Sequence, residues 1–325
     1  MRQIYTHKFL ENILDQYPNK GQIIKHFLFT SGFENSNYYV KTEQGEYVIK
    51  IFDGMGMKEE NILFEIELML FCTKNKLKTP ALYETKAKEW HVKNEGKIAI
   101  VMGYIDGTNC LKKKIAKTVI KEIGEQAGNM DAALKRFPKE IKIKPRENYE
   151  WDMKNFVMLE KAIDILPKEY DKEFIKGIFD DFRKIKPVFD KATKGIIHND
   201  IAAHNILVKE NELKAIIDFS DAAYSPYVQN VAVFFCQSLL TYNWVLEDGK
   251  LFLQAYEKHY PLSQEERDIL YDCIRARFAT IIVEFNRWNR VYGEDAQRTE
   301  YIKDHYEFLR KFSEIEREKF KAIIF

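Results

Sequence analysis

The sequence predicts an α+β protein of two lobes, in which a small antiparallel sheet with one main helix precedes a larger, mostly helical part. Strand and hairpin patterns are confined to about the first hundred residues, whereas helical periodicity dominates from Gly107 onward. At 325 residues the chain is also longer than a typical single domain. We place the boundary near Asp106 and Gly107, which gives an N-terminal lobe of 1–106 and a C-terminal lobe of 107–325.

Two hairpins and one helix account for the expected first lobe. Residues 38–40 and 47–52 are rich in Tyr, Val and Ile and flank a Gly-containing turn. Residues 90–93 and 97–102 repeat this arrangement around a second Gly-containing turn. Between the hairpins, residues 58–76 place apolar side chains at helical spacing, so we expect this helix to pack on the sheet.

Long helical stretches account for most of the second lobe. Only the segment from Gly195 to Phe219 interrupts them, with short strands. The polar run 138–149 reads as a connection between helices. The expected helical stretches, the last of which has a break near Gly293, are 113–135, 151–163, 169–191, 228–259 and 263–320.

The charge balance argues against a nucleic-acid or membrane-surface partner. The chain has 51 Lys and Arg against 50 Asp and Glu, a formal net charge of +1, and no run of like charges dominates. We therefore expect a small-molecule partner. The sequence leaves the oligomeric state open, and a homodimer is compatible with it.

The cysteines and the N-terminus indicate a cytoplasmic protein. There is no apolar signal region at the start, and the longest apolar stretch, around Val231–Leu240, is too short to span a bilayer. The cysteines form no Cys-x-x-Cys pair, which argues against a zinc site and a disulfide framework. They are Cys72, Cys110, Cys236 and Cys273.

One stretch, from His198 to Phe219, contains the candidate catalytic and metal-binding residues. His198-Asn199-Asp200 is followed by Asn205, and after a short hairpin by Asp218-Phe219, a His-x-Asp-x4-Asn layout typical of kinase-like folds. We assign Asp200 as catalytic base, and Asn205 and Asp218 as ligands of Mg²⁺ on the nucleotide phosphates. His198 is assigned to holding the loop. The alternative interpretation makes Asp200 and Asn205 turn-capping residues and Asp218 an ordinary strand-end acid.

His204, in the same loop, is expected to have a solvent-exposed or structural role.

A lysine in the first lobe indicates a phosphate site. Lys50 lies at the centre of an apolar strand, where it is costly unless it meets a partner. Glu65 lies on the helix face expected to pack on the sheet, and Glu67 points away by the helical period. We expect a Lys50–Glu65 ion pair that positions the lysine on ATP. The alternative is that Lys50 snorkels from an edge strand.

Two further segments are candidates for contacts with ATP. The turn at 30–37 offers backbone N–H groups and hydroxyls for phosphates, although it lacks the three-glycine pattern of protein kinases and resembles an ordinary hairpin turn. The strand that ends near residue 104 could pair with the adenine edge. The candidate residues in these segments are Ser31, Gly32, Asn35, Ser36, Met102 and Tyr104.

These blocks resemble the aminoglycoside phosphotransferase superfamily, which includes choline kinases, type II homoserine kinases and hydroxylysine kinases. Residues 32–52 are similar to the homoserine-kinase branch, whereas 218–228 and 260–277 look closer to the hydroxylysine-kinase branch. The resemblance implies a bilobal protein-kinase-like fold, with ATP bound by the N-terminal lobe. It also implies Mg²⁺ and transfer of the γ-phosphate to a hydroxyl of a small, often amine-bearing metabolite.

Four positions depart from the family pattern. Asn199 stands where Gly is usual, which puts the loop conformation in question. Asn230 stands where the family usually has Asp. Met130-Asp131 stands where the family has a helix that ends in a Leu-His-type pair. We expect the first of these two changes to reduce rigidity, and the second to affect contacts with the acceptor. Lys50 is present where many type II homoserine kinases have Thr.

The leading hypothesis is a small-molecule kinase of the homoserine-kinase or hydroxylysine-kinase type. The alternatives are an aminoglycoside or choline/ethanolamine phosphotransferase and, outside enzymes, a nucleotide-binding regulatory pseudokinase. The candidate acceptor-binding residues are Asp221, Arg277 and Glu284. A carboxylate on the acceptor would need a cation, for which Arg275 and Arg287 are further candidates. The sequence does not choose the acceptor, nor ATP over GTP.

Overall fold

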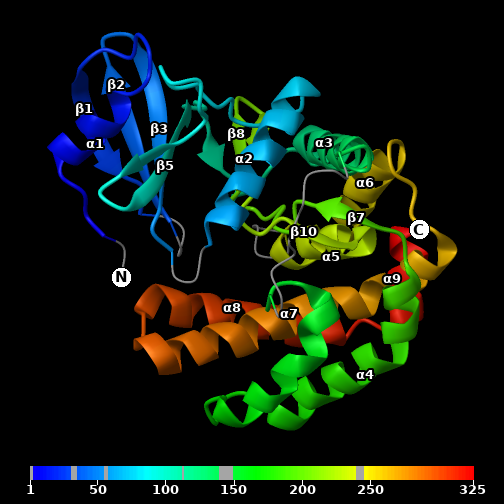
Figure 1. Cartoon of the computed structure of the whole chain (residues 1–325). Coiled ribbons are helices and arrows are strands. Elements are labelled where there is room, and N and C mark those ends of the chain that lie inside the picture. Colours follow the sequence, from blue (N-terminus) through cyan, green and yellow to red (C-terminus); the bar gives the residue numbers. More distant parts are fainter. Residues whose placement is uncertain (1–2, 31–34, 55–57, 112, 139–148, 239–244) are drawn as a thin grey trace. The chain divides into compact units, whose positions relative to one another are not determined.

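The computed structural model divides the chain into two compact units, Met1–Gly107 and Thr108–Phe325. The residues described are 3–30, 35–54, 58–111, 113–138, 149–238 and 245–325. Figure 1 shows the whole chain coloured by sequence.

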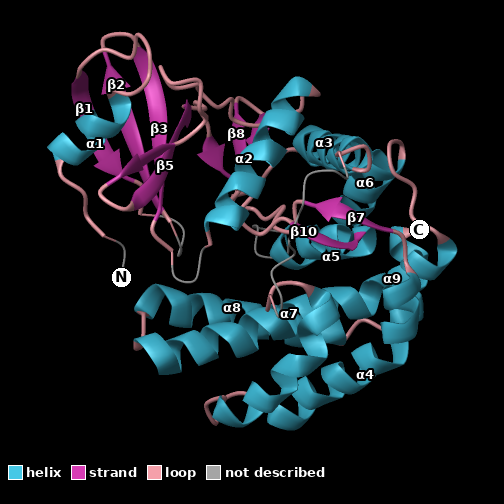
Figure 2. Ribbon diagram, in the orientation of Figure 1, coloured by secondary structure: helices cyan, strands magenta, loops and turns pink. Residues whose placement is uncertain are grey.

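Unit 1 contains a five-stranded antiparallel sheet (Figure 2). The predicted hairpins are confirmed as β2–β3 and β4–β5, whereas the outer strand β1 was not predicted. In sheet order the strands are β1 (Ile23–Leu28), β2 (Ser36–Thr42), β3 (Gly45–Phe52), β5 (Lys97–Gly103) and β4 (Val92–Asn94).

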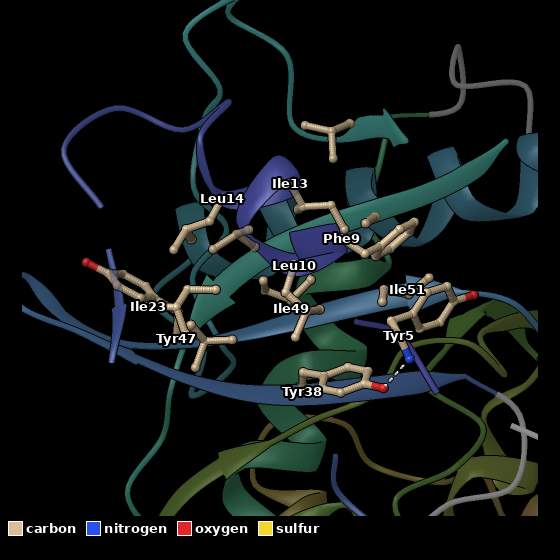
Figure 3. Packing of buried hydrophobic residues seen from close by; sticks show 14 of the residues in the cluster. Tyr5, Phe9, Leu10, Ile13, Leu14, Ile23, Tyr38, Tyr47, Ile49 and Ile51 are labelled. Carbon is tan, nitrogen blue, oxygen red and sulfur yellow. Dashed lines mark hydrogen bonds between the residues drawn. The ribbon is translucent and has the colours of Figure 1, made fainter. Parts of the chain in front are cut away.

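One hydrophobic cluster of unit 1 lies between the sheet and a short N-terminal helix, α1 (His7–Leu14), which was also not predicted. Thr6 caps this helix by accepting a hydrogen bond from the Phe9 N–H, and Phe9, Leu10 and Ile13 are buried against Ile49 and other strand residues (Figure 3). Eight residues give too few turns for a helical period to stand out in the sequence.

The predicted helix of unit 1 is confirmed as α2 (Glu59–Lys74). Its buried face includes Glu65, Ile66 and Met69, whereas Glu67 is exposed. The helical period therefore separated the two acids correctly.

Unit 2 is built around one long helix, α7 (Gln264–Tyr292), which packs on five other elements. Figure 1 shows α8 running beside it. The elements packed on α7 are η1 (Met153–Ile165), α4 (Lys172–Lys191), α5 (Tyr227–Ser238), α8 (Ala296–Ser313) and α9 (Arg317–Ile324).

Three of the expected helical stretches differ in detail. Residues 153–165 form a 3₁₀ helix. The stretch 228–259 contains α5 and a separate helix α6 (Leu246–Glu257), and residues 239–244 lie outside the described residues. The stretch 263–320 breaks at Gly293, as predicted, and again at 314–316 between α8 and α9.

The second break has a long-range cause. Tyr271 of α7 stacks on Phe312 and also contacts Phe320, and its hydroxyl donates to the Ile315 carbonyl at 2.8 Å. This carbonyl lies in the break itself and therefore has its partner in α7 rather than in α8 or α9. No Gly or Pro marks the position, so the sequence carried no local signal for it.

Two glycines bring α3 (Lys117–Leu134) unusually close to α6. A Cβ added at Gly124 would lie 2.3 Å from the Phe252 carbonyl oxygen, and one added at Gly128 would lie 2.3 Å from the Tyr256 carbonyl oxygen. Only residues without a side chain permit this approach. The close approach places Gly128 of α3 directly against the backbone of Tyr256 in α6.

Short strands frame the loop that carries the chemistry. The strand β7 (Lys194–Ile197) pairs with β10 (Ala223–Pro226), and the strand order β6 (Thr108–Asn109), β8 (Ile206–Lys209), β9 (Glu212–Ile216) forms a second small sheet. Residues 198–205 thus connect β7 to β8, and Asp218 follows β9.

No helix among the described residues is long and apolar enough to cross a membrane.

Candidate active site

Tight turns within residues 198–205 bring Asp200 and Asn205 together. The Asp200 carbonyl accepts from the Ala202 N–H, and the Ala202 carbonyl accepts from the Asn205 N–H, both at 2.8 Å. The Asp200 N–H donates to His198 Nδ1 at 3.3 Å. These bonds fix the loop backbone immediately around the predicted base.

The carboxylate of Asp200 is held at one oxygen and has a positive charge near the other. Its Oδ2 accepts a hydrogen bond from Asn205 Nδ2 at 2.6 Å and lies 3.1 Å from His204 Nε2, whereas Oδ1 lies 3.7 Å from Arg277 Nη2. Burial would raise the pKa of Asp200, but His204 and Arg277 outweigh it and lower the pKa overall. The carboxylate is therefore ionised at neutral pH.

Asn205 and Asp218 offer oxygen atoms suited to a hard cation. The Ile217 N–H donates to the Asn205 carbonyl at 2.9 Å, which holds the two segments side by side. Asn205 Nδ2 is engaged by Asp200, so the amide presents its Oδ1 on the other side. Asp218 has a φ of +66°, a left-handed conformation uncommon for Asp, and its Oδ1 accepts from the Ser220 hydroxyl at 2.6 Å.

Asn199 adopts the conformation that a glycine would supply. Its φ is +65°, and Asn is among the few residues with a side chain that tolerate this region. Its amide donates to the Asp221 carbonyl at 3.0 Å and accepts from Gln229 Nε2 at 2.7 Å. The departure at this position thus leaves the loop in a left-handed turn, with extra hydrogen bonds to its surroundings.

The two histidines of the loop differ. His198 is fully buried against Phe219, and burial lowers its pKa to about 4, so its ring is neutral. Burial would also lower the pKa of His204, but Asp200 raises it overall. Sequence reasoning missed the contact of His204 with Asp200, because four-residue spacing identifies neighbours in a helix and not in a loop.

Two of the predicted acceptor-side residues lie near the base. Arg277 is buried, with its guanidinium 5.0 Å from the centre of the Trp151 ring and its Nη1 donating to the Trp151 carbonyl at 3.2 Å. Asp221 accepts a hydrogen bond from the Tyr149 hydroxyl. Burial and the charge of Asp200 raise the pKa of Asp221 to about 6.

The third acceptor-side candidate, Glu284, is buried and paired with Arg287 at 2.7 Å. Arg287 also contacts Glu150 at 3.2 Å. Arg275 pairs with Asp181 at 2.8 Å. The structure thus brings Arg277 into contact with Asp200 and leaves the other two arginines in pairs with other acids.

In unit 1 the predicted Lys50–Glu65 ion pair is confirmed. Lys50 Nζ lies 2.6 Å from Glu65 Oε1, and each residue is 2% exposed. Because β3 lies between β2 and β5, the alternative of a lysine snorkelling from an edge strand is wrong.

The turn before β2 is tied to the end of β3. Ser36 donates to Asp53 through its N–H at 2.9 Å and its hydroxyl at 2.7 Å, and Asn35 Oδ1 accepts from the Gly54 N–H at 3.4 Å. Sequence reasoning missed this role of Asp53. The Ser36 hydroxyl is therefore engaged within the protein, and the phosphate contacts of this turn stay a prediction.

The remaining nucleotide candidates are only partly described. Ser31 and Gly32 lie outside the described residues. Met102 lies in β5 and forms a bridge with Leu82, and the Tyr104 N–H donates to the Glu46 carbonyl at 3.3 Å.

The chain is similar in sequence to known proteins. The sequence profile of the phosphotransferase enzyme family matches residues 28–270. Hydroxylysine kinase of Mus musculus is 27% identical over 209 residues, which cover 61% of this chain and 55% of that protein. Homoserine kinase of Zymomonas mobilis is 22% identical over 265 residues, 79% of each chain.

Among solved structures, an amicoumacin kinase in complex with AMP-PNP and Ca²⁺ superposes with a TM-score of 0.70 at 13% identity, covering 96% of this chain and 98% of that one. This likeness confirms the predicted protein-kinase-like fold, with its antiparallel sheet and helical second part. The profile covers about three quarters of the sequence. The chain therefore belongs to the phosphotransferase enzyme family.

Proposed function

We propose that the protein is an ATP- and Mg²⁺-dependent kinase that transfers the γ-phosphate to a hydroxyl group of a small amine-bearing metabolite. The observation that carries this proposal is the Asp200 carboxylate, ionised and contacted by Asn205, His204 and Arg277 in the loop between β7 and β8. The names of the hydroxylysine and homoserine kinases it resembles support a hydroxyl acceptor.

Asp200 acts as the base in this proposal. Its Oδ2 is occupied by Asn205 and His204, whereas its Oδ1 lies 3.7 Å from Arg277, beyond hydrogen-bond range. We therefore assign Oδ1 to the acceptor hydroxyl. It accepts the hydroxyl hydrogen bond, orients the oxygen toward the γ-phosphate and takes the proton as the new O–P bond forms and the bond between the γ-phosphorus and the leaving ADP oxygen breaks.

Asn205 and Asp218 are suited to hold Mg²⁺. One amide oxygen and one carboxylate match the oxygen ligands that this ion takes, usually together with phosphate oxygens and water. Within the described residues no three His, Cys, Asp or Glu side chains converge on one metal position. The ion would be held together with the nucleotide phosphates, whose charge it would neutralise.

The nucleotide contacts are assigned to unit 1. A lysine fixed by a buried glutamate presents a charge at a defined position, so Lys50 is assigned to the phosphates and Glu65 to holding it. The main chain at Met102 and Tyr104 is assigned to adenine. The turn with Ser31, Gly32 and Asn35 is assigned to the phosphates through its N–H groups. Ser36, predicted for the same role, donates both its N–H and its hydroxyl to Asp53, so we assign it to holding the turn.

Acids and one arginine near the base define the proposed acceptor side. Asp221, with a pKa of about 6, is charged at neutral pH and can bind an amine. Arg277 can contact an acceptor only beside Asp200, because its side chain is 3% exposed. Glu284 acts through its pair with Arg287. We also propose a cytoplasmic location, which the four free cysteines support.

A screen for phosphorylated product tests the proposed function. The protein is incubated with Mg²⁺-ATP and, separately, homoserine, hydroxylysine, choline, ethanolamine, methylthioribose, sugars and aminoglycosides, and both ATP consumption and product mass are measured. We expect turnover with an amino acid or amino alcohol. Binding of ATP without product from any acceptor would contradict the proposal and favour a regulatory nucleotide-binding protein.

A further inference from the structure

Two departures from the family pattern, Asp131 and Asn230, lie in direct contact. Asn230 Nδ2 donates to both carboxylate oxygens of Asp131, at 2.9 and 3.1 Å, and Asn230 Oδ1 accepts from the Asn199 N–H at 3.0 Å. The Asn199 N–H can only donate and the carboxylate mainly accepts, so these neighbours fix the orientation of the amide. Asn230 thus connects a carboxylate on α3 to the backbone beside the catalytic base.

Asp131 is buried and its hydrogen-bond partners Asn230 and Tyr256 are neutral. It is 0% exposed, and its Oδ2 accepts from the Tyr256 hydroxyl at 2.7 Å. In the part of the chain that the structure describes, no Lys or Arg forms an ion pair with it. Burial raises its pKa to about 7, although the Tyr256 and Asn230 hydrogen bonds act in the opposite direction. Burying such an acid is costly, and packing alone would favour an apolar residue.

The far end of this chain of hydrogen bonds is the left-handed turn of the loop. Asn199 has a φ of +65° and immediately precedes Asp200. The adjacent Gln229 of α5 holds the Asn199 side chain at 2.7 Å, while Asn230 holds its backbone. The side-chain amides of two successive α5 residues therefore fix Asn199. Gln229 binds its side chain, and Asn230, which is oriented by the Asp131 carboxylate, binds its backbone N–H.

We propose that Asp131 is a positioning residue that holds Asp200 through Asn230 and Asn199, and that Asp131 and Asn230 form an exchangeable acid–amide pair. The proposal rests on the proposed function, in which Asp200 is the base. The hydrogen bonds can be made in either arrangement. With the acid at 230 and the amide at 131, the Asn199 N–H donates directly to the acid, the amide at 131 donates to the acid, and Tyr256 donates to the amide oxygen.

The test compares four proteins: wild type, Asp131→Asn, Asn230→Asp and the double exchange. Asp131→Asn should lower kcat about three- to tenfold, because the amide of Asn230 loses the carboxyl group that orients it. Asn230→Asp should lower it about 10- to 100-fold, and more strongly at higher pH, because two facing carboxylates must share a proton. The double exchange should restore kcat to within about threefold of wild type.

Three further readouts separate positioning from general stability. The KM for ATP should stay within about twofold in all four proteins, since Asp200 acts on the acceptor. Asp272→Asn is the matched control: this acid is also buried but pairs with Arg317, so its loss should lower the melting temperature and leave kcat unchanged. Hydrogen exchange of the peptide containing Asn199 should be faster in both single variants and return to normal in the double exchange.

A double exchange that melts like the wild type yet stays as slow as Asn230→Asp would overturn the proposal. So would wild-type kcat together with wild-type exchange in both single variants. If the wild type turns over no acceptor, the proposed function fails, but the exchange comparison still decides the positioning proposal, because it requires no turnover.

Discussion

The two units each bury an acid with a different kind of partner. In unit 1, Glu65 meets Lys50 at 2.6 Å, and the charges of the pair offset each other. In unit 2, Asp131 meets Asn230 and Tyr256, which are neutral. An ion pair tolerates burial because each charge stabilises the other, whereas an acid held by neutral donors shifts its pKa instead. The Lys50–Glu65 pair fixes the position of the lysine charge, whereas Asp131 fixes the orientation of the Asn230 side chain.

The largest expected loss of stability comes from removing the acid of the Lys50–Glu65 pair. Glu65→Ala leaves Lys50 without this carboxylate in a buried position, so the free energy of unfolding should fall by about 3–5 kcal/mol. Denaturant titration measures it. Glu67→Ala on the exposed face of the same helix is the matched control and should change stability by less than about 0.5 kcal/mol. Equal effects of the two substitutions would contradict the account of this pair.

Loss of a proposed metal ligand should weaken nucleotide binding only in the presence of the metal. Asp218→Ala should lower the affinity for ATP with Mg²⁺ by about 10- to 100-fold, because one of two protein oxygens for the ion is lost. Titration calorimetry with and without Mg²⁺ measures this difference. The exposed acid Asp190 gives the control, since Asp190→Ala should leave both titrations unchanged. An unchanged affinity for Mg²⁺-ATP in Asp218→Ala would rule out the ligand role.

Because the partners of Asp131 are neutral, we expect its contribution to the stability of the protein to depend on pH between about 4 and 7. Folding raises the pKa of Asp131 from about 4 to about 7, so its contribution to stability is complete below about pH 4 and is lost as the pH rises through 7. Relative to Asp131→Asn, the wild type should therefore lose up to about 1.4 kcal/mol per pH unit across this window.

Unfolding at several pH values between 5 and 8 measures this loss. Tyr256→Phe removes a hydrogen bond that lowers the pKa of Asp131, so it should move the window upward. A constant difference between wild type and Asp131→Asn at every pH would show that the acid is ionised throughout, as in an ion pair.

The smallest expected effect concerns His204, which touches the base from within the loop. His204→Ala removes a contact at 3.1 Å from Asp200 Oδ2 and should lower kcat about tenfold, with little change in the KM for ATP. His204→Gln keeps a donor and should retain more activity. The exposed His259 is the control. If His204→Ala matches the wild type, Asn205 and Arg277 alone hold the base.

The same contrast explains what the sequence could reveal. Lys50 and Glu65 were predictable because a lysine in an apolar strand is conspicuous and the helical period selects one acid. Asp200, Asn205 and Asp218 were identified by their spacing, and the structure places Asp200 and Asn205 in contact. The two hairpins and the main helix of unit 1 followed from alternation and turn residues.

Other features depend on contacts that have no local signature. Asp131 meets Asn230 across 99 positions and Tyr256 across 125, through neutral groups found throughout any sequence. The break between α8 and α9 depends on Tyr271, more than forty positions away. The close approach of α3 and α6 depends on Gly124 and Gly128, which within a predicted helix give no sign of what lies against them.

The kcat of Asp200→Ala tests the central claim most directly. With the acceptor that the wild type turns over best, we predict a loss of at least about 1,000-fold in kcat, because the base that orients the hydroxyl is gone. Affinity for Mg²⁺-ATP should stay within about threefold, since the assigned metal ligands are Asn205 and Asp218. Turnover like that of the wild type in this variant would contradict the account.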